Sequence, residues 1–140
     1  MVDDQSSLVG HIVDSVADAV IFADRSGTIA QWNRACESLF GFAAQEALGQ
    51  NLDLIIPERL RGSHWRGFDA AIEHGVTRLQ GRPTVTRAVH KSGRKLYVEM
   101  TFAIVAAAGE ARGAVAVARD VTERVLRERE APEPANNAPG

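Results

Sequence analysis

The sequence predicts an α+β domain built around one five-stranded antiparallel sheet. Two segments of strand character stand near the start of the chain, at 19–24 and 28–33. Short helical segments fill the middle, and three further strand segments follow one another at 83–90, 94–106 and 114–122. Strands joined by short turns pair in antiparallel fashion, so we expect short helices to cover one face of a single sheet.

The first elements of the chain follow from periodicity and from turn residues. Leu8, Ile12 and Val16 recur at helical spacing and predict an amphipathic helix over 7–17. A glycine-containing turn at 25–27 joins the first two strands into a hairpin.

Capping residues mark the helices of the middle segment. Asn33 is a suitable N-cap for a helix over 34–41, which Gly41 would end. A second short helix is expected over 43–49. The longest helix is predicted over 57–75, with proline in its first turn and glycine at its end.

The strand at 94–106 shows strong alternation between apolar and polar side chains. One of its faces carries Leu96, Val98, Met100, Phe102 and Ile104, and the other carries Tyr97, Glu99 and Thr101. A turn is expected at 109–113, and a charged helix at 122–130 ends the ordered part of the chain. The alternation predicts that one face of the sheet packs on the core.

Composition indicates a single domain and excludes several classes of function. The 140 residues are 45% hydrophobic and 24% charged, which suits one packed core. The formal net charge of -2 argues against a nucleic-acid partner, and no apolar run reaches the roughly 18 residues of a membrane span. The acidic N-terminus has no secretory character and Cys36 is the single cysteine, so we expect a cytoplasmic protein without disulfides.

The chain divides into four parts. A helical cap at 1–17 precedes the main domain at 18–122, and a signalling helix at 123–130 precedes a tail at 131–140. The tail is rich in Pro, Asn and Ala and is expected to be disordered. The first helix has more apolar surface than one sheet edge can cover, and the last helix has a narrow apolar stripe, so both helices predict a homodimer.

Four segments occur in an order that resembles the PAS sensor domains. They read ADAVIFADRSGTIAQWNRACESLFGF, EALGQNLDLIIPE, HKSGRKLYVEMTFAIV and GAVAVARDVTER. The resemblance covers residues 8–125, and Asp120-Val121-Thr122 resembles the family's exit into its output helix. It implies a PAS fold, a pocket between the helical middle and the sheet, and a role in signal transduction.

The long helix carries a histidine in the middle of an apolar face. The residues that share this face are Leu60, His64, Phe68, Ala71 and Ile72. A buried imidazole needs a partner, which haem iron or a backbone carbonyl supplies in known proteins. Residues 57–82 resemble the haem-binding PAS oxygen sensors, namely the rhizobial oxygen-sensing kinases and the direct oxygen-sensing phosphodiesterases. The resemblance implies haem b, with His64 as the iron ligand and with Leu60, Phe68 and Ile72 in the haem pocket.

The same resemblance implies a distal side formed by Arg82, Met100 and Phe102. Arg82 stands 18 positions after His64, where the phosphodiesterase type has a methionine. Thr84 occupies the place of the kinase type's distal arginine. A thioether is an acceptable axial ligand of haem iron, and core packing alone would also account for Met100 and Phe102.

Photochemistry through a flavin–thiol adduct is excluded by the residue at one position. The flavin-binding photosensors of the PAS family carry a reactive cysteine in the segment that corresponds to 49–54, and Leu52 stands in its place. Cys36 lies in an earlier helix, where a small buried hydrophobic side chain is expected.

These features predict a haem-binding sensor of a diatomic gas (O2, CO or NO) or of redox state. It would signal through its dimer or through a separate output protein such as a kinase or a regulator. A cofactor-free module for protein interaction and a small-metabolite sensor stay open as alternatives. We expect no enzymatic activity, because no acid–base pair or nucleophile is evident, and neither nucleic acid nor membrane as a partner.

Overall fold

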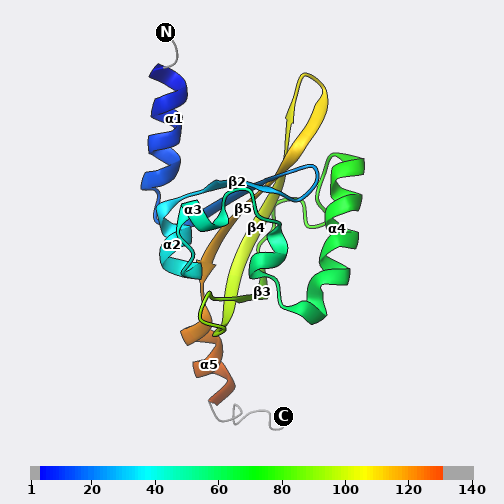
Figure 1. The fold of residues 1–140 in the computed structure, drawn as a ribbon. Helices are drawn as coiled ribbons and strands as arrows, with labels where there is room; N and C mark the ends of the chain where they lie inside the picture. Colours follow the sequence, from blue (N-terminus) through cyan, green and yellow to red (C-terminus); the bar gives the residue numbers. More distant parts are fainter. Residues whose placement is uncertain (1–3, 131–140) are drawn as a thin grey trace.

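The computed structural model describes residues 4–130, which form one sheet with the helices of the middle segment on one of its faces, while the first and last helices extend from it (Figure 1). The strands are β1 (Ala19–Asp24), β2 (Ile29–Trp32), β3 (Thr84–Val89), β4 (Lys95–Ala107) and β5 (Glu110–Asp120). The α-helices are α1 (Asp4–Ser15), α2 (Arg34–Phe40), α3 (Ala44–Ala47), α4 (Arg61–His74) and α5 (Thr122–Glu130), with 3-10 turns η1 (Leu52–Ile55) and η2 (Glu58–Leu60). The strand order is β2-β1-β5-β4-β3 with antiparallel pairing, so the predicted α+β class and five-stranded sheet are confirmed.

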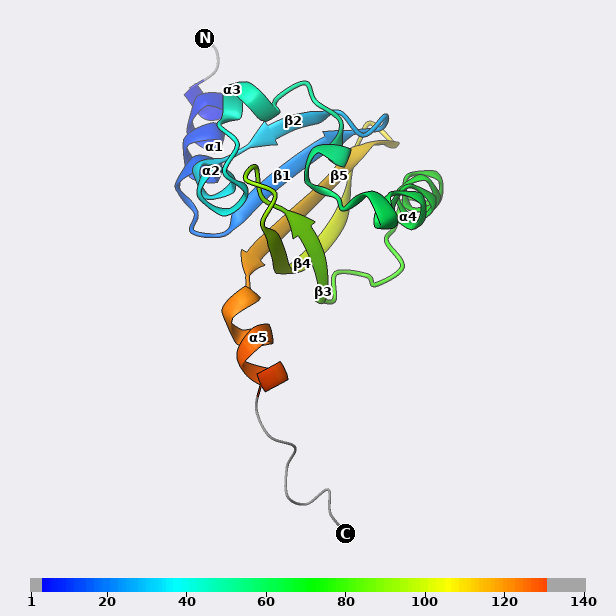
Figure 2. The same ribbon diagram turned by 60° about the horizontal axis from the view of Figure 1, so that its bottom comes forward.

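The strand register gives the sheet a buried inner face. Residues directly opposite one another in antiparallel strands share a face, and Ala19, Ala118 and Met100 are such partners across β1, β5 and β4. All three are buried, together with Cys36 and Phe40 of α2. The predicted apolar face of β4 therefore forms the floor of the core, with α2, α3 and η1 packed over it (Figure 2).

The helix predicted over 57–75 is divided in two. Pro57 precedes the 3-10 turn η2, and α4 begins only at Arg61. The Leu60 amide donates to the Pro57 carbonyl at 2.9 Å, which closes the tighter turn before the helix starts. The C-terminal boundary is confirmed, because Gly75 caps α4 with a left-handed φ of 76°.

The turn predicted at 109–113 is wrong. The chain reverses at Ala108 and Gly109, whose φ values of 54° and 78° are both positive, and β5 already begins at Glu110. Two positive φ values match the right-handed twist of the flanking strands in a two-residue turn. The β4–β5 hairpin is consequently longer than expected and extends beyond the rest of the sheet (Figure 1).

The remaining elements lie close to their predicted positions. The N-terminal helix is found at Asp4–Ser15, Asn33 caps α2 through its side chain, and Gly41 ends α2 with a φ of 82°. The tail at 131–140 lies outside the described residues, so its predicted disorder stays a prediction. A helix long and apolar enough to cross a membrane does not occur within 4–130.

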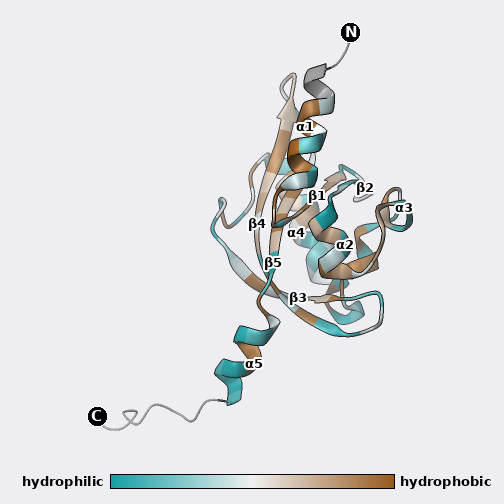
Figure 3. Ribbon diagram, turned by 90° about the vertical axis from the view of Figure 1, so that its left-hand side faces the viewer, coloured by the Kyte–Doolittle hydropathy of each residue, from teal (hydrophilic) through white to brown (hydrophobic). Residues whose placement is uncertain are grey.

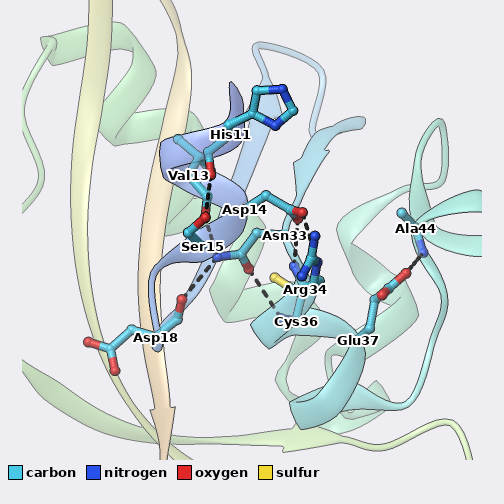
Figure 4. A network of polar contacts seen from close by, with 10 residues as sticks. All are labelled: His11, Val13, Asp14, Ser15, Asp18, Asn33, Arg34, Cys36, Glu37 and Ala44. Atoms are coloured by element: carbon cyan, nitrogen blue, oxygen red, sulfur yellow. Dashed lines mark hydrogen bonds and ion pairs between the residues drawn. The ribbon is translucent and has the colours of Figure 1, made fainter. Parts of the chain in front are cut away.

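Asn33 joins the N-terminal helix to the domain (Figure 4). Its amide nitrogen donates to the Val13 carbonyl at 2.8 Å and to the Asp18 carbonyl at 3.1 Å. Its amide oxygen accepts from the Val20 amide at 2.9 Å and from the Cys36 amide at 3.1 Å. Only 3% of Asn33 is exposed, so these four hydrogen bonds form where water cannot replace them.

We expect Asn33→Asp to destabilise the protein by about 2–4 kcal/mol, because a carboxylate cannot donate to the Val13 and Asp18 carbonyls. Urea denaturation with an unchanged m-value is the measurement. Gln31→Ala, an exposed change on β2, is the control and should stay within about 0.5 kcal/mol of the parent. Equal stability of Asn33→Asp and the parent protein would contradict this role.

Candidate functional site

The candidate site is centred on His64, near the start of α4. Its ring centroid lies 4.6 Å from that of Trp65 and 6.0 Å from that of Phe68. Phe68 is buried one turn further along the helix, and Ile72 is half-buried another turn on. The predicted face of the helix is therefore turned towards the protein.

The Nδ1 atom of His64 is buried and has no hydrogen-bond partner among the described residues. Burial lowers the pKa of His64, and the negative charges of Asp53 and Asp69 oppose this shift. The imidazole is consequently neutral near pH 7, which is the form that binds a metal ion. An unpaired buried nitrogen costs free energy, so a partner from outside the chain would stabilise it.

Trp65 holds this part of α4 against the sheet. Its Nε1 donates to the Asp53 carboxylate at 2.8 Å. Its ring lies against Gly27, where an added Cβ atom would come within 2.2 Å of the ring. Gly27 also needs its φ of 83° to close the β1–β2 turn, so one glycine serves both the hairpin and the helix.

Arg61 adds a second connection between α4 and the preceding segment. Its Nε donates to the Ile56 carbonyl at 3.1 Å and its Nη2 to the Asp53 carbonyl at 3.3 Å. Trp65, Asp53 and Arg61 are not among the site residues predicted from the sequence. Their contacts form between separate elements, so no local pattern reveals them. The only sequence signal for them is the position of a tryptophan next to His64.

Where β4 and β5 pair near their hairpin, the inner face of the sheet is only half covered. Val98 is fully buried and Ala118 is 1% exposed, whereas Phe102 and Ala116, which pair across β4 and β5, are only half-buried. Asp24 pairs with Gly113 near the same end of the sheet, and the β1–β2 turn that follows Asp24 contacts the Trp65 ring through Gly27. Helix α4 therefore lies over this part of the sheet. An apolar surface that includes Phe102 and Ala116 therefore lies below the helix that carries His64.

The other predicted site residues are placed as follows. Met100 is buried on the inner face, and Phe102 packs against the same core. Leu60 forms the N-cap of α4 and also lines a groove shared with β3 and α5. Arg82 is exposed, and its Nε donates to the Leu79 carbonyl at 3.0 Å within its own loop. The structure thus brings His64 and Phe68 together and holds Arg82 away from the inner face.

The residues around His64 fit a haem group in two respects. A neutral histidine with an unpaired ring nitrogen can act as the single protein ligand of iron, and the half-covered inner face offers apolar contacts. Cys36 is 0% exposed, and burial raises the pKa of its thiol to about 12, as expected of an inert core residue. Leu52, at the position of the photosensors' cysteine, is half-buried in η1.

The fold is a five-stranded antiparallel sheet with helices packed over its inner face. The family model described as "PAS fold" matches residues 8–121, and the chain belongs to this family. The predicted PAS fold is thereby confirmed.

Two curated relatives are sensor proteins by name, one of them an oxygen sensor. The oxygen sensor protein DosP of Escherichia coli is 26% identical over 106 residues, which cover 76% of this chain and 12% of that protein. The sensor protein FixL of Bradyrhizobium diazoefficiens is 40% identical over 53 residues, which cover 38% of this chain and 10% of that protein. The chain therefore spans only a small part of the curated relatives that it matches.

Solved structures agree on the fold. A PAS domain from Colwellia psychrerythraea has a TM-score of 0.74 at 24% identity, covering 86% of this chain and all of that one. An RNA-binding light-oxygen-voltage receptor has a TM-score of 0.70 at 24% identity, covering 89% of this chain and 35% of that one. At this identity, the likeness shows the fold alone.

We expect Gly27→Ala to cost more stability than Gly109→Ala, although both glycines have positive φ values. Gly109 has no atom within 4 Å of an added Cβ, so its change costs only the backbone strain, about 1–2 kcal/mol. Gly27→Ala should cost about 1–3 kcal/mol more, because the methyl group displaces the Trp65 ring. Urea denaturation followed by tryptophan fluorescence measures both, and equal losses would show that the Trp65 contact does not hold α4.

Proposed function

We propose that the protein is a haem-binding sensor of a diatomic gas or of redox state, with His64 as the protein ligand of the iron. The observation that carries the proposal is the buried, unpaired Nδ1 of a neutral histidine on the helix over the half-covered inner face. The names of the two relatives, an oxygen sensor protein and a sensor protein, support the same conclusion. Bound haem would supply reversible gas binding or a change of oxidation state.

The chain's own residues have three tasks in this proposal. Phe68 and Ile72 exclude water on the side of α4, and Met100 and Phe102 form the apolar wall on the sheet. Arg82 provides a guanidinium for a bound gas once it leaves the Leu79 carbonyl. None of these tasks is catalytic, so we propose a sensor and not an enzyme.

A structural change caused by gas binding or by a change of oxidation state would reach the exit helix α5 through β4. This strand carries Met100 on the inner face and begins next to α5, where Thr122 Oγ1 accepts from the Tyr97 amide at 2.8 Å. The Asp120 carboxylate accepts from the Thr122 amide at 2.8 Å and caps α5. We propose that α5 passes the signal to a dimer partner or to a separate output protein such as a kinase or a regulator.

We expect His64→Ala to remove the sharp Soret band that the parent protein shows after reconstitution with hemin. His64→Gly should behave alike, and added imidazole should restore the band by replacing the lost side chain. His74→Ala, a change at the exposed end of the same helix, is the matched control and should keep the band. Sharp Soret bands of equal height in His64→Ala and the parent would refute the assignment of His64.

We expect Arg82→Ala to raise the O2 dissociation rate of the ferrous protein about tenfold or more, because the variant loses a charge-assisted hydrogen bond to the bound gas. Stopped-flow release of O2 measures it. Arg78→Ala, in the same loop and equally exposed, removes the same charge and should leave the rate unchanged. An unchanged rate in Arg82→Ala would remove this residue from the gas site.

We also propose that the protein forms a homodimer through α1. This helix stands clear of the sheet (Figure 1). It shows apolar patches, while α5 is mostly hydrophilic (Figure 3). Leu8, Val9 and Ile12 are 57%, 52% and 53% exposed, and Val16 is 40% exposed. A short helix with such a surface is marginal alone, so a second copy of α1 is the occupant that its apolar face fits.

We expect the double variant Leu8→Glu, Ile12→Glu to be monomeric at micromolar concentration, because charged side chains cannot pair across an apolar helix seam. Light scattering measures the mass. Val105→Glu, on the exposed part of β4, is the control and should stay dimeric. A monomeric parent protein would refute the dimer, and a dimeric double variant would show that α1 is not its interface.

A further inference from the structure

A groove lies on the surface of the protein, between η2, the edge strand β3 and the exit helix α5. Its volume is about 440 Å³. Three guanidinium groups line it, together with one phenol and apolar side chains: Arg59, Arg87, Arg129, Tyr97, Leu60 and Val125. The groove is therefore both cationic and partly apolar, although the chain as a whole has a net charge of -2.

The three arginines have no carboxylate partner in the part of the chain that the structure describes. Other arginines of the same region do have one, since Arg124 lies 3.9 Å from Glu99 and Arg127 lies 3.3 Å from Glu123. No aspartate or glutamate is among the described residues that line the groove. The side chains that line the groove therefore supply positive charge and no negative charge.

Tyr97 organises two of the three guanidinium groups. The Cζ atoms of Arg87 and Arg129 lie 5.2 Å and 5.1 Å from the centre of its ring, as in cation–π contacts. Arg87 Nη2 also donates to the Tyr97 hydroxyl at 3.1 Å. Two like charges are therefore held beside one ring in the same groove, and a polyanion that contacts both would relieve their repulsion.

We propose that this groove binds a small organic polyanion, with two or more carboxylate or phosphate groups and a short apolar portion. Guanidinium groups recognise the paired oxygens of both kinds of group. Leu60 and Val125 line the apolar part of the groove. A volume of about 440 Å³ suits a small molecule, within the ordinary range of ligand sites.

Binding would connect elements that the chain itself joins only loosely. Arg129 and Val125 belong to α5, Arg87 to β3 and Arg59 to η2. A polyanion bound to these groups would fix α5 to the sheet. The ligand would therefore control the helix that we propose carries the signal to the output. The site needs neither haem nor His64, and its failure would leave the haem proposal unchanged.

The test titrates the full chain without haem with citrate and with pyrophosphate, at about 0.15 M salt to screen distant charges. Isothermal calorimetry measures affinity, and amide hydrogen exchange measures protection of α5. We expect saturable binding of at least one probe and slower exchange in α5. Tighter binding of citrate would identify a polycarboxylate as the ligand, and tighter binding of pyrophosphate would identify a phosphate compound.

Arg87→Gln and Arg129→Gln should each weaken binding about tenfold, the loss expected for a charge-assisted hydrogen bond. Arg129 is exposed, so its variant tests the site even where Arg87→Gln disturbs β3. Arg112→Gln, on the far hairpin, removes the same charge and should bind as the parent does. The proposal would be overturned by an equal loss of affinity in Arg112→Gln, or by no binding of either probe at 10 mM, which is roughly the weak limit of a specific site. Binding of a hexaglutamate peptide, but of neither probe, would also overturn it.

Discussion

The position of α4 depends on the contact between the Trp65 ring and the Cα atom of Gly27. No side chain fits between them, and the same glycine closes the β1–β2 turn with a positive φ. The Asp53 carboxylate fixes the other edge of the indole. Because His64 directly precedes Trp65, the contact that fixes the start of α4 also fixes the position of the imidazole. The hairpin and the candidate site therefore share one constraint.

The parts of the fold that follow from local chemistry could be predicted from the sequence. Alternation predicted the inner face of β4 because successive side chains of a strand point to opposite sides, and Asn33 and Gly41 marked α2 through their capping chemistry. Ala108 gave no such signal, since alanine rarely adopts the positive φ that its turn requires. The contact of Trp65 with Gly27 joins separate elements, and no local pattern of the sequence encodes it.

The candidate site shows the same division. Helical spacing placed His64 and Phe68 on one face of α4, as found, because that relation is internal to the helix. The place of Arg82 depends on the path of its loop, and the structure keeps its guanidinium on the Leu79 carbonyl. The cationic groove depends on strand register, which sets Arg87 opposite Tyr97, and on the return of α5 to the sheet, which adds Arg129. Neither the strand register nor the position of α5 on the sheet can be predicted from a periodic pattern of residues.

Strand β4 connects the two candidate ligand sites. Met100 and Tyr97 point to opposite faces of this strand, so the proposed haem pocket and the cationic groove lie on its two sides. Thr122, the first residue of α5, bonds to both the amide and the carbonyl of Tyr97. A ligand that shifts β4 from its inner face therefore changes the hydrogen bonds that hold α5. It also changes the positions of the arginines on the outer face of the strand. Two ligands that bias the same helix must alter each other's affinity by the same factor, so the proposed gas or redox signal and the polyanion would report on one another through β4.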